Sequence, residues 1–432
     1  MQHIDLIVQG TLVPMQGKDI LEDGAIAIHQ GIIKALGPSA AIMATYSAQT
    51  TLAAQDSFVL PGFVNGHTHV GMSFLRGVAD DAQDLQSWLQ DYIFPLEKKF
   101  LSEDFVYWST TLACYEMIQS GVTTFADMYF FEYAAAQAVA HAGMRAILGE
   151  TIFIMRDLVY AQEFCNALKG YSPLITAAVA PHSLYSCDAQ TLMQAHDFSH
   201  THDVPFIIHV AEQKNEILTL RKKTGLSPSE YMQSLVLLSP RVIIAHGVHF
   251  SDADLAIVGK SGASIIYNPT SNMKLGSGIA RVKSMQEHGI AVGLGTDGTA
   301  SNNALDAFAE MKTGALLQDL CVEDYCKPLT PFEVVKLATI DGARALKMDH
   351  KIGSLQVGKA ADMIIMNRQD FAQLPSYDVY SQIVYASKST DVQTVIIDGK
   401  IVMHKRRMVT LFDKVAQLRE RIAHYQKAIK NI

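Results

Sequence analysis

The chain has 432 residues, 49% of them hydrophobic and 18% charged, and is too long for one ordinary domain unless that domain is a barrel with additions. Its 35 lysines and arginines against 43 aspartates and glutamates leave a net charge of -8, which argues against nucleic acid as a partner. No apolar run approaches the ~18 residues of a membrane-spanning helix, and the start, MQHIDLIVQG, does not resemble a signal peptide. The five cysteines are odd in number and scattered, so we expect a cytoplasmic protein with reduced thiols and no membrane partner.

Residues 1–57 alternate between apolar and polar side chains and are interrupted by glycines, as in GAIAIHQGIIKALG. This period of two is typical of antiparallel strands joined by tight turns. We expect these residues to form the first part of a small β domain.

From residue 58 to residue 350, short apolar runs alternate with amphipathic stretches. The helical stretches have start signals, namely the capping residues Ser102, Asp188 and Ser251. The apolar runs are eight candidate strands: FVLPGFVNGHTH from Phe58, VTTFADMYF from Val122, RAILGETIF from Arg145, LITAAVAPH from Leu174, PFIIHVAE from Pro205, VIIAHGVHF from Val242, SIIYNP from Ser264 and IAVGLGTDG from Ile290.

Eight strands alternating with helices predict an α/β fold, a (β/α)8 TIM-type barrel over residues 58–350. A doubly wound open sheet is the alternative, but it leaves the placement of the polar residues unexplained. Nearly every candidate strand is apolar at its start and polar at its end, and in barrel enzymes the carboxyl ends of the strands face the active site. The polar strand ends are His67, His69, Asp127, Glu150, His182, His209, Glu212, His246 and Asp297.

The end of the chain resembles its beginning. Residues 351–410 again alternate with a period of two, as in VQTVIIDGKIVM, and we expect them to complete the β domain begun by residues 1–57. Residues 411–432 have the pattern of an amphipathic C-terminal helix whose charged face is solvated.

Four of the polar strand ends have the composition of a metal site. His67 and His69 lie two residues apart, so in a strand both imidazoles point the same way. With His209 and Asp297 they predict a site for one divalent ion that keeps a position open for water. Such an ion lowers the pKa of its water from about 15.7 to near 7, and Asp297 could take the water's proton. Each residue alone also has a structural interpretation; Asp297 before glycine, for example, is common in turns.

Two further polar residues could take part in proton transfer. Glu212, three residues after His209, could protonate a ring nitrogen of a heterocycle, although it could also cap a helix. His246 could orient the attacking water, although it could also be an ordinary polar strand end. His200 and His202 repeat the two-residue spacing, but they precede the fifth strand and should lie at the opposite rim of the barrel.

The strings PGFVNGHTHVGMSFLRG, HVAE, AHGVH, NPTSNMKLGSGIA and GLGTDGTASNNALDAF resemble the amidohydrolase superfamily. Within it they are similar to the 5-methylthioadenosine/S-adenosylhomocysteine deaminase group, which is related to triazine chlorohydrolases. The resemblance covers essentially the whole chain. It implies one metal ion, most often Zn²⁺ and sometimes Fe²⁺, with His67, His69, His209 and Asp297 as ligands. It also implies that Glu212 is the proton shuttle and that His246 orients the water, with Glu212, His246 and Asp297 as the catalytic residues.

The same resemblance implies three substrate contacts. Glu97 matches a glutamate that binds the ribose hydroxyls of a nucleoside, and a carboxylate can accept from two hydroxyls. Without the resemblance it could equally be an exposed helix acid. His182 matches a histidine that contacts substrate. Trp88, in LQSWLQDYIFP, looks like part of a loop that covers the ligand; core packing is the competing interpretation.

One position departs from the group's pattern. Members often place an arginine near the end of the third strand, where it meets a homocysteine carboxylate. Here that place holds Glu150, with Arg145 at the other end of the strand and Arg156 beyond it as a candidate substitute. A glutamate would repel a carboxylate-bearing ligand, which favours methylthioadenosine or adenosine over S-adenosylhomocysteine.

The resulting hypothesis is a metal-dependent aminohydrolase that converts an adenine nucleoside to the inosine-type product and ammonia. The nearest alternative is a deaminase or chlorohydrolase that acts on another purine, pterin, pyrimidine or triazine; a ligand without ribose would have no use for Glu97. A catalytically inactive scaffold is the remote alternative. The expected partners are a small heterocyclic substrate and further copies of the chain in a dimer or tetramer.

Overall fold

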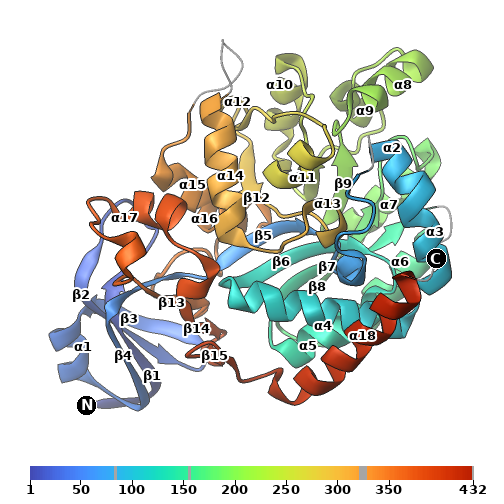
Figure 1. Cartoon of the computed structure of the whole chain (residues 1–432). Coiled ribbons are helices and arrows are strands. Elements are labelled where there is room, and N and C mark those ends of the chain that lie inside the picture. Colours follow the sequence, from blue (N-terminus) through green and yellow to red (C-terminus); the bar gives the residue numbers. More distant parts are fainter. Residues whose placement is uncertain (82–84, 154–156, 321–327, 431–432) are drawn as a thin grey trace.

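The computed structural model describes residues 1–81, 85–153, 157–320 and 328–430, and it contains two sheets of eight strands each. One sheet forms a barrel surrounded by helices, and the other lies beside it and holds strands from both ends of the chain (Figure 1). In the described part of the chain, no helix is both long and apolar enough to cross a membrane.

The barrel confirms the predicted fold class. Its strands are parallel and neighbour one another in chain order, which matches the eight apolar runs of the sequence. The ring is nearly closed, because the backbone N–H of Asp297, just after the last strand, donates to the carbonyl of His67 in the first at 2.9 Å. The strands are β5 (Phe63–Thr68), β6 (Val122–Tyr129), β7 (Arg145–Ile152), β8 (Ile175–Pro181), β9 (Phe206–Val210), β10 (Val242–His246), β11 (Ser264–Tyr267) and β12 (Ala291–Leu294).

Helices surround the barrel, and the predicted capping residues start three of them. The side chain of Ser102 accepts from the N–H of Phe105, and Asp188 and Ser251 cap their helices in the same way. The helices are α4 (Glu103–Gln119), α5 (Glu132–Ala142), α6 (Leu158–Ala167), α7 (Ala189–His202), α8 (Lys214–Thr224), α9 (Pro228–Ser234), α10 (Asp252–Ser261), α11 (Pro269–Lys274), α12 (Val282–Glu287), α13 (Thr299–Asn302), α14 (Ala307–Leu320), α15 (Pro331–Leu337) and α16 (Ile340–Ala345).

A helical segment between β5 and α4 lies at the carboxyl ends of the strands. It consists of η1 (Val70–Leu75), α2 (Leu85–Ser87), η2 (Trp88–Ile93) and α3 (Phe94–Phe100). Its apolar side chains form a cluster with residues of α4 and of the end of β6. The segment therefore both covers and packs against the mouth of the barrel.

The second sheet joins the two ends of the chain, as predicted. Its order is β16-β15-β14-β13-β4-β1-β2-β3, so the C-terminal strand β13 pairs with β4 from the N-terminal part. One pairing differs from the expected antiparallel pattern, because β1 and β4 run parallel. The strands are β1 (Gln2–Leu12), β2 (Leu21–His29), β3 (Ile32–Pro38), β4 (Tyr46–Pro61), β13 (Met363–Asn367), β14 (Val392–Ile397), β15 (Lys400–His404) and β16 (Arg407–Met408), with α1 (Ser39–Thr45) before β4.

The chain passes from this sheet to the barrel at Gly62. The predicted boundary lay after residue 57, but β4 continues to Pro61 and only then does β5 begin. A side chain at Gly62 would meet Thr123 on the neighbouring strand, since a Cβ there would lie 2.1 Å from the Thr123 side chain. Glycine is therefore required for this close approach of the two strands.

The C-terminal helix leaves the second sheet and returns to the barrel. This helix, α18 (Val415–Lys430), lies beside α4 (Figure 1) and also contacts η1. Four short helical turns lie between β13 and β14: η3 (Phe371–Gln373), α17 (Val379–Ser381), η4 (Gln382–Ala386) and η5 (Ser389–Asp391). A fifth, η6 (Phe412–Lys414), connects β16 to α18.

Candidate active site

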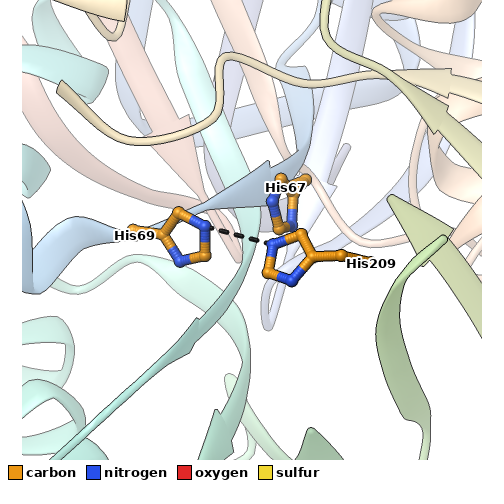
Figure 2. Close-up of side chains that lie close together, drawn as sticks. All are labelled: His67, His69 and His209. Carbon is orange, nitrogen blue, oxygen red and sulfur yellow. Dashed lines mark hydrogen bonds between the residues drawn. The ribbon is translucent and has the colours of Figure 1, made fainter. Parts of the chain in front are cut away.

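Three imidazoles and one carboxylate meet at the carboxyl ends of the barrel strands. The Nε2 atoms of His69 and His209 lie 3.3 Å apart, and His67 completes the group (Figure 2). Oδ1 of Asp297 lies 3.2 Å from Nε2 of His69 and 3.4 Å from Nε2 of His67. Residues separated by 230 positions in the sequence thus share one small volume.

The partners of the imidazoles orient their free nitrogens toward this volume. Nδ1–H of His69 donates to the carbonyl of Met128 at 2.6 Å, and Nδ1–H of His209 donates to the carbonyl of His182 at 2.8 Å. A proton held on Nδ1 leaves Nε2 with its lone pair, which is the form that binds a metal. Both rings therefore present a ligand atom to the centre of the site.

These residues fit a divalent cation. Nε2 of His67 is buried and makes no hydrogen bond within the described chain, an arrangement that is costly unless the nitrogen has another partner. The donor set of three imidazole nitrogens and a carboxylate oxygen is that of known zinc sites. His67 also forms a second close group with His246 and Asp297, so ring position alone does not distinguish ligands from neighbours.

Burial and the Asp297 carboxylate act in opposite directions on the histidines. Burial lowers the pKa of His67 to about 4 and lowers the pKa of His209 well below its usual value, so both rings are neutral at pH 7. Burial also lowers the pKa of His69, but hydrogen bonding and charge from Asp297 outweigh it and raise that pKa to about 9. For Asp297, burial raises the pKa, but the adjacent imidazoles of His67 and His69 outweigh it and hold the pKa well below its usual value. A metal ion at this site would therefore displace a proton from His69.

One carboxyl group, that of Glu212, and one imidazole, that of His246, lie beside this cluster. Oε2 of Glu212 lies 3.8 Å from Nε2 of His246, and Ser277 Oγ donates to Oε1 of Glu212 at 3.5 Å. Burial, helped by the charge of Asp297, raises the pKa of Glu212 to about 8, so this group carries a proton at neutral pH. Burial lowers the pKa of His246 to about 4, which keeps its ring neutral.

Three residues at this place have a left-handed backbone conformation. His246 and Asp297 have φ of +77° and +62°, and Ala211, next to Glu212, has φ of +57°. Side-chain-bearing residues rarely adopt this conformation, and such residues cluster at functional sites.

The comparisons with known proteins agree with this geometry. The model of the amidohydrolase family matches residues 58–402, which is most of the chain. The chain belongs to the amidohydrolase family. Within 419 aligned residues it is 42% identical to the 5-methylthioadenosine/S-adenosylhomocysteine deaminase of Syntrophobacter fumaroxidans, covering 95% of this chain and 94% of that one.

Two further relatives support the assignment. A 5'-deoxyadenosine deaminase of Methanosarcina mazei is 38% identical, with 94% of each chain covered. The crystal structure of an adenosine deaminase from Xanthomonas campestris with bound zinc superimposes with a TM-score of 0.95 at 31% identity, covering 100% of both chains. The amidohydrolase fold predicted from the sequence is thus shown over the full length.

Three of the predicted substrate residues, Glu97, His182 and Trp88, line a cavity next to the metal-site cluster of this amidohydrolase. Glu97 on α3 is buried, and Tyr129 donates its hydroxyl to Oε1 of Glu97 at 2.5 Å. Burial raises the pKa of Glu97 to about 7, against the effect of that hydrogen bond. His182 lines the cavity, and burial lowers its pKa to about 3. Trp88 in η2 both lines the cavity and packs in the apolar cluster, so the two interpretations of this residue are compatible.

One of the predicted substrate residues, Glu150, lies away from the cavity. Strand β7 points Thr151 into the cavity, so Glu150 points outward, and its carboxylate accepts from the N–H groups of Phe131 at 3.2 Å and Glu132 at 2.8 Å. The expectation that Glu150 faces the substrate is corrected by this alternation. Arg156 lies outside the described residues. Arg145 begins β7 at the opposite end of the barrel, as predicted.

Two residues that support the site, Asp127 and Glu216, were assigned no role from the sequence. Asp127 Oδ1 accepts from Thr68 Oγ1 at 2.5 Å and from the N–H of Val70 at 2.8 Å, and so fixes the backbone on both sides of His69. Glu216 accepts from the N–H groups of Ala211 and Glu212, each at 3.0 Å. Asp127 is one of the polar strand ends that can be recognised in the sequence. Glu216 lies on a helix, and nothing in its spacing indicates this contact.

Proposed function

We propose that this amidohydrolase removes the 6-amino group of adenine nucleosides, giving the inosine-type nucleoside and ammonia. The observation that carries the proposal is the meeting of His67, His69, His209 and Asp297 beside a protonated Glu212. The deaminases of adenine nucleosides among its full-length relatives support the same reaction.

In this proposal zinc is the metal, held by the Nε2 atoms of the three histidines and by the carboxylate of Asp297. The adenosine deaminase of Xanthomonas campestris, which has bound zinc, supports this choice over iron. When bound, the ion supplies Lewis acidity that lowers the pKa of a water molecule from about 15.7 to near 7.

The residues of the chain move the protons. Glu212 donates its proton to N1 of the adenine ring, which makes C6 electrophilic, and Asp297 accepts a proton from the attacking water. The water oxygen forms a bond to C6, and Asp297 returns its proton to the amino group. The bond from C6 to that nitrogen then breaks, ammonia leaves, and the hydroxyl proton remaining on O6 passes to Glu212. One water is consumed, one ammonia is released, and both carboxyl groups regain their starting states.

The nucleoside's sugar is the second part of the proposal. Glu97 lies in the cavity wall, where its carboxylate can accept from two ribose hydroxyls. Leu85, Leu89, Phe94 and Phe153 line the same cavity and suit a small apolar 5' substituent, as in methylthioadenosine or 5'-deoxyadenosine. Because Glu150 points away from the cavity, its charge is no longer a reason to expect that S-adenosylhomocysteine is excluded.

The experiment is a spectrophotometric assay of the zinc-loaded full-length protein with methylthioadenosine, adenosine, S-adenosylhomocysteine and free adenine. The proposal predicts a shift from adenine to hypoxanthine absorbance, with a higher kcat/KM for the nucleosides than for the free base. A faster reaction with free adenine would contradict the role of the ribose, and no reaction with any of the four would contradict the function.

A further inference from the structure

One short stretch contacts both of the groups that handle the water in the proposed reaction. It runs from Asn268, at the end of β11, to Asn272 in α11, and every residue in it except Thr270 is buried. We propose that this stretch is a positioning element that fixes the ring tautomer of His246 and the carboxylate orientation of Asp297. The inference rests on the proposed function, since it assigns the stretch to the same reaction.

Two amide groups of this stretch converge on one nitrogen of His246. Nδ2 of Asn272 lies 2.8 Å from Nδ1 of His246, and Nδ2 of Asn268 lies 3.3 Å from the same atom. In this orientation the two amide N–H₂ groups donate, so Nδ1 accepts and carries no hydrogen. A neutral imidazole without a proton on Nδ1 carries it on Nε2, which is the atom nearest Glu212.

This arrangement is the reverse of that at the proposed metal ligands. His69 and His209 donate from Nδ1 to backbone carbonyls, which leaves Nε2 free to bind a cation. His246 accepts at Nδ1, so its Nε2–H is a donor and not a ligand. The hydrogen-bond partners thus distinguish His246 from the ligands, although its ring lies within the same cluster. As a donor, Nε2–H of His246 can bind the oxygen of the attacking water and leave a lone pair of that oxygen pointing toward C6.

Ser271, from the same stretch, fixes the orientation of Asp297. Its hydroxyl donates to Oδ2 at 2.6 Å, and the N–H of Gly298 donates to Oδ1 at 2.9 Å. Oδ1 is also the oxygen nearest His67 and His69. Each carboxylate oxygen therefore has its own donor, and rotation of the carboxylate would break both hydrogen bonds.

The backbone of the stretch is itself held in place. The N–H of Asn272 donates to the carbonyl of Asn268 at 3.0 Å, and the carbonyl of Asn272 accepts from the N–H of Ser277 at 2.8 Å. Ser277 also contacts Glu212 through its hydroxyl. A displacement of this one element would therefore disturb His246 and Asp297 together.

The first test reads the tautomer directly and needs no substrate. The zinc-loaded full-length protein is labelled with ¹⁵N-histidine, and the ring of His246 is assigned in long-range ¹H–¹⁵N spectra by the signals lost in His246→Gln. We expect a proton on Nε2 and none on Nδ1. A rotated Asn272 amide would present its oxygen and place the proton on Nδ1, and that result would overturn the proposal. Because this readout is independent of turnover, it stands even if the proposed function fails.

The second test separates positioning from folding. Asn272→Asp offers Nδ1 a carboxylate, which can only accept, so we expect protonation of Nδ1 and a kcat lowered by about 10- to 100-fold, as for other groups that orient a metal site. Ser271→Ala should lower kcat by a similar factor. In both variants KM and the zinc content should stay unchanged, and the exposed Met273→Ala on the same helix should match the parent protein. An unchanged kcat in Asn272→Asp and Ser271→Ala would overturn the positioning role.

Discussion

The protonation of Glu212 is the residue-level feature that matters most for the proposed reaction. Its pKa is raised to about 8, mainly by burial, so at pH 7 the carboxyl group is mostly protonated and can donate to N1. We predict that kcat/KM falls as the pH rises through about 8, because the donor is then lost. Glu212→Gln should lower kcat by about 10²- to 10⁴-fold and abolish this limb of the pH–rate profile. A profile that rises through pH 8 in the parent protein would contradict the assignment.

Glu97 gives a second test at the residue scale. Above its pKa of about 7, Glu97 is a charged acceptor for the ribose hydroxyls, and replacement by Gln removes this charge but keeps the shape of the side chain. A hydrogen bond to a charged group is worth about 1.5–3 kcal/mol, so Glu97→Gln should lower kcat/KM for methylthioadenosine by about 10- to 100-fold. Turnover of free adenine, measured in parallel, should not change. Equal losses with both substrates would show that Glu97 acts on the catalytic centre and not on the sugar.

The individual residues also show where sequence reasoning succeeds. His67, His69, His209 and Asp297 could be found because strand ends of a barrel meet at one mouth, whatever their separation in the chain. Glu150 is a polar residue near a strand end, but the alternation from Ile147, which faces the barrel interior, turns its side chain outward. The roles of Ser271 and Asn272 could not be predicted, since they depend on contacts between a short helix and two other strand ends.

At the scale of elements, helix α18 packs against η1, the short helix that follows strand β5. Tyr425 stacks on Phe74 of η1 at 5.1 Å between ring centroids, and its hydroxyl donates to Asp104 at 2.7 Å. Helix η1 also carries Met72, which lines the cavity of the active site. The C-terminal helix was predicted from its pattern, but its packing partner could not be, because an amphipathic pattern does not identify the surface that it covers.

We predict that Tyr425→Ala destabilises the protein by about 3–5 kcal/mol, the usual cost of removing a buried aromatic ring. KM should rise as well, since η1 loses its support. Tyr425→Phe is the matched control, because it keeps the ring and loses only one hydrogen bond, worth about 1 kcal/mol. Thermal unfolding and steady-state kinetics measure both effects. An unchanged KM in Tyr425→Ala would show that α18 does not support the active site.

At the scale of the whole molecule, a buried ion pair joins the barrel to the second sheet. Arg145 is fully buried at the start of β7, and its guanidinium binds Asp362 through two hydrogen bonds of 2.8 and 3.0 Å. It also reaches Asp398, in the turn between β14 and β15, at 3.4 Å. Both parts of the molecule were expected from the sequence, but this connection was not, because it links residues more than 200 positions apart.

We predict that Arg145→Met destabilises the protein by about 3–5 kcal/mol, since it leaves the Asp362 carboxylate buried without its partner. The double variant Arg145→Met/Asp362→Asn should recover much of this loss, because no charge is then left unpaired. Urea unfolding measures both. The folded fraction should keep its kcat, since the pair lies at the end of the barrel opposite the active site. A double variant no more stable than Arg145→Met would contradict the charge explanation.

The most direct test of the central claim is a crystal structure of the zinc-loaded protein with data collected at the zinc absorption edge. We predict one anomalous peak, at about 2.0–2.1 Å from the Nε2 atoms of His67, His69 and His209 and beside the carboxylate of Asp297. We also predict that Nε2 of His246 is not bonded to the ion. A peak bonded to His246 in place of His69 or His209, or no peak among these residues, would contradict the claim.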